Sequence, residues 1–212
     1  MTAHLLEKID WSRIDIDHSL EHSYKDFHAK GLDYLCLVRT PALTVKAYFF
    51  EGDAEVASEV VNPHDHRYPF MTQCYSGTIV NKRYRVPPCW DGESIGDECG
   101  PMYNVFHYRT PLLGGNGFEH IDAIPLQQYQ TEYAPAGHRY WQNADEFHTI
   151  KVFERDTVIV IAQYADVVPE DEPTVMFSQA AEPPNLDGLY SKFKADQLVK
   201  RIGQLRELAG KL

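Results

Sequence analysis

Short runs of β-branched and aromatic residues recur along most of this chain, and turn-forming Gly, Pro, Asn or Asp residues separate them. Such runs predict β-strands, because branched and aromatic side chains suit a pleated, half-buried surface. Many short strands with turns between them are typical of β-sandwiches and closed barrels. We therefore expect an all-β fold, with strands near residues 34–38, 44–50, 71–75, 78–84, 127–133, 138–142, 149–153 and 157–162.

The last two of these runs are joined by a short polar turn, and this spacing predicts that they pair as a hairpin. The second run is apolar throughout, which is typical of a strand that is buried on both faces. Residues 87–117, in contrast, are rich in Gly and Pro and predict a long irregular insert with one strand near 102–108. Inserts of this kind often shape access to a site.

Helical patterning is confined to the two ends of the chain, where apolar residues recur at helical spacing. A doubly wound α/β fold would alternate helices with strands throughout, so that class is excluded. We expect a single domain over residues 1–212. Its barrel core should span about 34–168, with an N-terminal helical segment at 1–31 and a C-terminal helix at about 187–211.

The charge and composition of the chain limit its partners. The formal net charge is −11, so the chain lacks the basic surface that binds nucleic acid or an anionic membrane. It has no long apolar run, and its first ten residues lack the order of a secretory signal. We therefore expect a cytoplasmic protein with no nucleic-acid or membrane partner. Its four cysteines should then be free thiols, although Cys89 and Cys99 flank one Gly-rich stretch and could approach each other.

Two histidines, His64 and His66, form the sharpest chemical signal in the chain. Residues two apart in an extended segment point to the same face, so both imidazoles would project into one space. Imidazole is a good ligand for iron, zinc, copper and nickel. The pair therefore predicts the first half of a metal site.

The surroundings of this pair resemble the first motif of the cupin family. Pro63, His64 and His66 are followed by the aromatic Phe70 and by a turn glycine, Gly77. Cupins usually carry a Glu four or five residues after the second His, and this chain has Phe70 and Met71 there. Without this Glu, the His64-Asp65-His66 motif is similar to that of cysteine-dioxygenase-like cupins, whose metal sites have three histidines. Over roughly residues 44–165, the resemblance implies a double-stranded β-helix, or jelly-roll, barrel.

The resemblance implies a third histidine further along the chain, and two candidates fit. His148 lies in a Phe-His-Thr-Ile segment at the start of the expected hairpin, and His138 follows a Pro-Ala-Gly turn. We favour His148, because a ligand at the end of a strand is well positioned, and keep His138 as the alternative.

A three-histidine cupin implies a non-haem Fe(II) oxygenase, of the thiol dioxygenase or hydroxylase type, that acts on a small molecule with O₂. Two alternatives remain open. The first is a metal-dependent isomerase or lyase that uses Zn, Mn or Ni as a Lewis acid. The second is a cupin without catalytic activity, whose metal stabilises a small-molecule-binding barrel.

Several side chains are candidates for contact with the substrate, and none is assigned a catalytic role. An arginine that reaches the interior could bind a carboxylate or phosphate, and tyrosines could line the site. The candidates are Arg83, Arg85, Tyr68, Tyr75 and Tyr140. The amphipathic terminal helices would either cover open sheet edges or form the interface of a homodimer.

Overall fold

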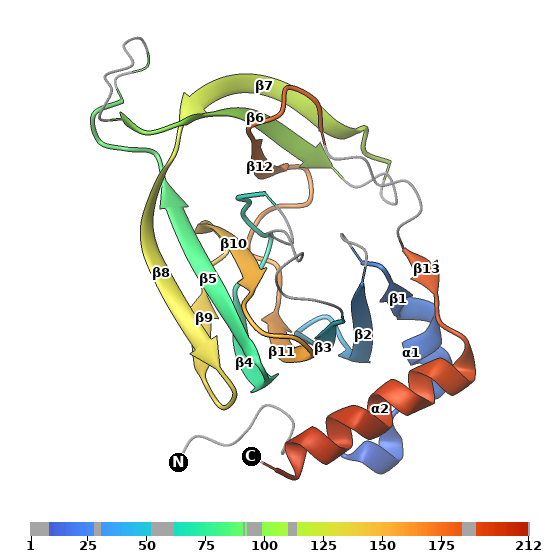
Figure 1. Ribbon diagram of the computed structural model, residues 1–212. Helices are drawn as coiled ribbons and strands as arrows, with labels where there is room; N and C mark the ends of the chain where they lie inside the picture. The colour runs from blue at the N-terminus through green and yellow to red at the C-terminus, as the bar shows by residue number, and fades with distance from the viewer. Residues whose placement is uncertain are drawn as a thin grey trace.

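The computed structural model describes residues 9–27, 31–51, 62–90, 92, 99–109, 114–183 and 190–211. Within them, strands form the body of the molecule and helices lie near the two ends of the chain (Figure 1). The helical elements are η1 (Trp11–Arg13), α1 (Ile16–His22) and α2 (Ala195–Ala209). The strands are β1 (Tyr24–Lys25), β2 (Leu32–Arg39), β3 (Leu43–Phe50), β4 (Phe70–Ser76), β5 (Thr78–Arg85), β6 (Met102–Arg109), β7 (Gly117–Pro125), β8 (Gln127–Pro135), β9 (Arg139–Gln142), β10 (Phe147–Val152), β11 (Thr157–Tyr164), β12 (Thr174–Ser178) and β13 (Ser191–Lys192).

The strand order is that of a jelly roll. The main sheet has the order β13-β1-β2-β3-β11-β4-β9, and a second sheet has the order β10-β5-β8. The segment at His64 bridges to His148 in β10 and so adds a fourth member to the second sheet. The two layers β3-β11-β4-β9 and 62–66-β10-β5-β8 interleave early and late strands, as jelly rolls such as cupins do. The predicted all-β jelly-roll fold is therefore confirmed, although the described sheets do not join into one closed hydrogen-bonded barrel.

The predicted hairpin at residues 149–162 is wrong. Strand β10 pairs with β5 in the second sheet, whereas β11 pairs with both β3 and β4 in the main sheet. The turn between them carries the chain from one layer to the other. A short turn limits only how far apart two strands can lie, and the burial of their apolar faces then decides which strands pair.

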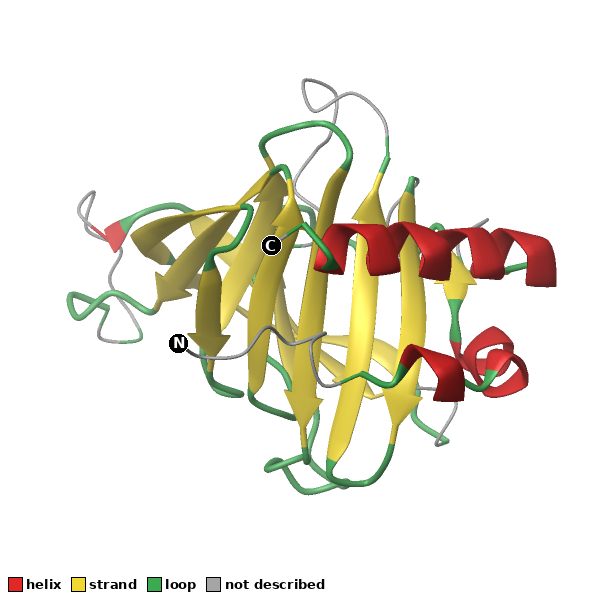
Figure 2. Cartoon of the chain, turned by 90° about the horizontal axis from the view of Figure 1, so that it is seen from below, coloured by secondary structure: helices red, strands yellow, loops and turns green. Residues whose placement is uncertain are grey.

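The main sheet is buried on both faces. Alternate residues of β11, such as Val158 and Val160, pack with Leu198 and Leu205 of α2 in one apolar cluster. The intervening Ile159 packs between the two sheets. Figure 2 shows α2 lying across the strands of this sheet. This double burial explains why β11 reads as a continuous apolar run.

The terminal helices are shorter than expected. The N-terminal segment contains α1 at Ile16–His22, and residues 24–25 already form β1. At the other end, residues 191–192 form β13, which pairs with β1, and α2 begins only at Ala195. Parts of both segments that were expected to be helical therefore form the paired strands β1 and β13 instead. Residues 1–8, 28–30 and 187–189 of the expected helical segments lie outside the described residues.

The insert at 87–117 is more ordered than its composition suggests. Its strand β6 covers the predicted 102–108, and with β7 and β12 it forms a third sheet. A disulfide joins Cys89 and Cys99, whose Cα atoms lie 6.0 Å apart, so the expectation of free thiols is wrong for this pair. Cys36 and Cys74 are free and buried. Residues 91, 93–98 and 110–113 of the insert are outside the described residues.

Disulfides are more usual in oxidising compartments, so the cytoplasmic location stays a prediction. The single domain and the homodimer stay predictions as well. Among the residues that the structure describes, no helix is both long enough and apolar enough to cross a bilayer.

Candidate metal centre

His64 and His148 are brought together by a β-bridge between segments that lie far apart in the sequence. The backbone N–H of His64 donates to the carbonyl of His148 (3.2 Å), and the N–H of His148 donates back to the carbonyl of His64 (3.0 Å). Residues directly opposite in an antiparallel pair place their side chains on the same face. The two imidazole centroids consequently lie 5.1 Å apart.

His66 joins the same group. Its ring centroid lies 4.6 Å from that of His64 and 5.1 Å from that of His148. Each of the three side chains offers one ring nitrogen, and these three nitrogens lie within 4.8 Å of one another. Nε2 of His66 lies 2.9 Å from Nε2 of His148. We refer to these three residues as the histidine cluster.

The cluster fits a divalent metal ion. Imidazole nitrogens bind such ions at about 2.0–2.1 Å, so two nitrogens that share one ion lie roughly 3 Å apart or slightly more. The separation of the two Nε2 atoms is close to this value. The other ring nitrogens are already engaged: Nδ1 of His64 contacts the Asn62 carbonyl at 2.8 Å, and Nδ1 of His148 contacts Oδ1 of Asn81 at 2.9 Å. Such acceptors hold the proton on Nδ1 and leave Nε2 free for a metal.

The electrostatic surroundings favour the neutral form of two of these imidazoles, those of His148 and His64. Burial lowers the pKa of His148 well below its usual value, and the charges of His64 and Arg83 lower it further. Burial also lowers the pKa of His64, although the hydrogen bond to the Asn62 carbonyl acts in the opposite direction. Neutral imidazole is the form that binds metals. Within the described residues, the cluster contains no carboxylate or thiolate ligand.

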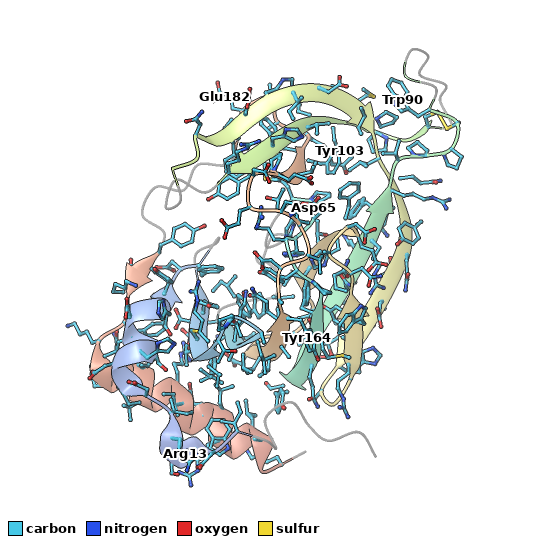
Figure 3. All side chains as sticks on the ribbon, turned by 180° about the vertical axis from the view of Figure 1, so that it is seen from behind. Arg13, Asp65, Trp90, Tyr103, Tyr164 and Glu182 are labelled. Carbon is cyan, nitrogen blue, oxygen red and sulfur yellow. A yellow bond between two sulfur atoms is a disulfide. The ribbon has the colours of Figure 1, made fainter. Side chains whose placement is uncertain are left out.

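Asp65 holds the extended segment in place from its other side. Its backbone N–H donates to the carbonyl of Val175 in β12 (3.1 Å), and its Oδ1 accepts from the Val175 N–H (2.7 Å). Figure 3 labels Asp65 below the sheet that contains β12. Burial raises the pKa of its carboxyl group to about 6. Asp65 thus fixes the segment that carries His64 and His66.

The structure brings His148, and not His138, beside His64 and His66. His138 follows the turn after β8, and its Nε2 lies 3.0 Å from Oε1 of Glu132. The two arginines of the candidate set are engaged elsewhere. Arg83 donates to Oε2 of Glu132 (3.0 Å) and to the Trp141 carbonyl (2.8 Å), and Arg85 contacts the side chain of Gln127 at 3.2 and 3.4 Å.

The three candidate tyrosines lie in different places. The ring of Tyr68 lies 5.4 Å from that of His66, so it borders the cluster. Tyr75 packs in the apolar cluster beneath α2, on the opposite face of the main sheet. Tyr140 lies in the core between the sheets, where burial raises the pKa of its hydroxyl.

Comparisons with known proteins do not assign the chain to a family. No family model matches it, and no curated protein matches it. Similar solved structures include KdgF from Halomonas sp., at 13% identity over 68% of this chain and 89% of that one, with a TM-score of 0.39. An RmlC-like cupin from Shewanella frigidimarina has 12% identity, coverages of 68% and 86%, and a TM-score of 0.39.

Hydroxypropylphosphonic acid epoxidase from S. wedmorenis is also similar, at 15% identity, coverages of 68% and 56%, and a TM-score of 0.37. Because these TM-scores are below 0.5, the jelly-roll assignment rests on the strand order and not on these likenesses.

Sequence reasoning missed the polar residues that support the cluster. Asn81 holds His148, and Nδ2 of Asn81 donates to Oε1 of Gln142 (3.3 Å). Lys46 in β3 is buried, and its Nζ donates to the hydroxyl of Tyr68 (2.9 Å). The one available signal was a lysine in the middle of the apolar run Thr44–Phe50, where a charge is unusual.

Proposed function

We propose that this protein is a non-haem Fe(II)-dependent oxygenase of the three-histidine cupin type, which acts on a small molecule together with O₂. The observation that carries the proposal is the convergence of three imidazoles without a carboxylate among the described residues. Imidazole suits iron among other transition metals, and three neutral ligands leave the full charge of a divalent ion for the substrate and O₂. Fe(II), when bound, would activate O₂ and polarise the substrate.

The residues around the cluster support this role by orienting the ligands. The Asn62 carbonyl and Asn81 keep the Nε2 lone pairs of His64 and His148 directed toward the shared space. Phe70 lies against His66 and His148, at ring centroid distances of 4.9 and 5.7 Å, and forms an apolar wall. His148 is 4% exposed, whereas His64 and His66 are partly exposed, so a small molecule would approach from their side.

The thiol dioxygenase and hydroxylase types are both compatible with this site, because in each the bound metal would hold a small substrate together with O₂. An isomerase or lyase would use the same ligands without O₂. The identity of the native metal and the need for O₂ therefore decide among these functions.

The test is metal analysis of protein purified without oxygen and without a nickel column, using inductively coupled plasma mass spectrometry. We expect near-stoichiometric iron in the wild type and loss of iron in His148→Ala, because one of the three ligands is removed. His138→Ala is the matched control and should keep its iron, since His138 contacts Glu132 instead. Oxygen consumption with panels of small thiols and hydroxylatable acids then tests the reaction.

Zinc or manganese as the native metal, with turnover that needs no O₂, would overturn the oxygenase in favour of the isomerase or lyase. Failure to bind any metal after reconstitution would overturn the metal centre itself.

A further inference from the structure

Lys46 is a buried basic residue that has no role in the metal centre itself. It lies in the middle of β3, directly opposite Ile161 of β11, and is 8% exposed. Ile161 packs against the core between the two sheets, whereas Val45 and Ala47 pack beneath α2. Opposed residues share a face, so Lys46 points to the inter-sheet side, where the histidine cluster also lies.

The ammonium group of Lys46 has few partners. Nζ donates one hydrogen bond, to the hydroxyl of Tyr68 (2.9 Å), and lies 4.7 Å from the ring centroid of Tyr68 and 5.9 Å from that of Tyr34. No carboxylate of the described residues lies within ion-pair distance of it. An ammonium has three donors, and the described residues accept a hydrogen bond from one of them.

The pKa of this amine is nevertheless raised above its usual value. Burial lowers the pKa of Lys46, but the neighbouring hydroxyls of Tyr48 and Tyr68 outweigh burial and raise it to about 12. Burying a charge without a counter-ion is costly, and proteins rarely retain it without a use.

A second buried cationic side chain, that of Arg83, shows the contrast. Arg83 is 6% exposed, and its guanidinium is paired with the carboxylate of Glu132 at 3.0 Å. The charge of Arg83 is therefore compensated within the protein. Lys46 is compensated only by a hydroxyl and by ring faces.

Tyr68 connects this cation to the histidine cluster. It contacts Lys46 through its hydroxyl and lies 5.4 Å from the ring of His66. Because the hydroxyl accepts from Lys46, its own proton can be donated to a ligand. Two donors, Nζ of Lys46 and Oη of Tyr68, thus converge beside the cluster.

We propose that Lys46 and Tyr68 bind an oxyanion, a carboxylate or a phosphate, at the end of the substrate opposite the group held at the histidine cluster. This inference rests on the proposed function, because it assigns the substrate class of the same site. A divalent ion held by the histidine cluster would add its positive charge to that of Lys46, which favours an anionic substrate. Asp65, the acid between His64 and His66, instead binds the backbone of β12.

The test is isothermal titration calorimetry of the metal-loaded protein with succinate, inorganic phosphate and the neutral analogue succinamide. We expect one or both anions to bind the wild type, and Lys46→Met to raise their Kd by about tenfold or more, because a charge-assisted contact is lost. Tyr68→Phe should raise the Kd by a smaller factor. Succinamide should bind no better to the wild type than to Lys46→Met.

Lys151→Met is the matched control, because Lys151 is exposed on β10 and its loss changes the net charge equally. Its Kd for the anions should equal that of the wild type. Lys46→Met should keep its melting temperature, since an apolar side chain of similar length replaces a buried charge. Equal Kd values in Lys46→Met and the wild type, or no binding of either anion, would overturn the proposal.

Metal content separates this inference from the proposed function. Lys46→Met should keep the metal that His148→Ala loses. Loss of anion binding with intact metal supports the role of Lys46. Lys46-dependent anion binding by a protein that takes up no metal would leave the anion site standing and overturn the oxygenase.

Discussion

At the scale of single residues, the chemistry of the site depends on side chains that orient the ligands. Asn81 and Gln142 are fully buried, and they form a series of hydrogen bonds from His148 to the carbonyl of Glu146. A buried amide in such a series has one orientation, because reversal would oppose donors to donors. His148 therefore presents Nε2 to the cluster.

We predict that Asn81→Ala lowers metal affinity by about tenfold to a hundredfold, because the acceptor that fixes the tautomer of His148 is lost. Competition titration against a chelator measures this affinity. Asn81→Asp keeps the acceptor for His148 but loses the donor to Gln142, so it should lower affinity less than Asn81→Ala. Asn104→Ala is the control, since Asn104 holds His120, 3.0 Å away, in a similar Asn–His pair outside the cluster. Wild-type affinity in Asn81→Ala would contradict the role given to Asn81.

At the scale of elements, the passage of the chain between the sheets depends on Gly77. This residue separates β4 in the main sheet from β5 in the second sheet and has φ +69°. A Cβ atom there would also collide with the side chain of Thr157. Both the backbone conformation and the space therefore require glycine at this position.

Gly77→Ala should lower the free energy of unfolding by about 1–3 kcal/mol or more, from backbone strain together with the collision. Urea denaturation measures the change. Gly117→Ala separates the two causes, because Gly117 has φ +78° but no atom within 4 Å of an added Cβ. It should be destabilised less than Gly77→Ala, and equal losses would mean that the collision contributes nothing.

At the scale of the whole molecule, the main sheet separates two apolar cores. One lies beneath α2 and the other lies between the sheets, on the side of the histidine cluster. Helix α2 is held by Leu198 and Leu205, both fully buried, and by Arg201, which pairs with Asp33 at 2.7 Å. The core beneath α2 therefore stabilises the scaffold without contacting the site.

Leu198→Ala should lower the free energy of unfolding by about 2–5 kcal/mol, because it leaves a cavity beneath α2. The folded variant should keep its metal, since the cavity lies on the far side of the main sheet. Thermal unfolding and metal analysis on the same sample check both expectations. Val199→Ala, at a position that is 52% exposed, should change stability by less than about 0.5 kcal/mol. Loss of metal from folded Leu198→Ala would show that the two sides are coupled.

The sequence by itself determined what depends on local backbone geometry. Strand-forming runs predicted the all-β class, because side-chain shape and the period of two act within a few residues. The same period placed His64 and His66 on one face. The apolar run at 157–162 predicted a strand buried on both faces, as β11 is.

Only the tertiary structure decided which distant segments meet. Three findings depend on strand order. His148, and not His138, lies beside His64 and His66, and β10 and β11 belong to two sheets. Among the described residues, Arg83 has a carboxylate partner and Lys46 has none. Strand order is set by the burial of apolar faces over the whole chain, and a local pattern does not encode it. Residues 191–192 lie within the expected C-terminal helix, but they form a strand that pairs with β1. Contacts across the fold outweigh local helix propensity there.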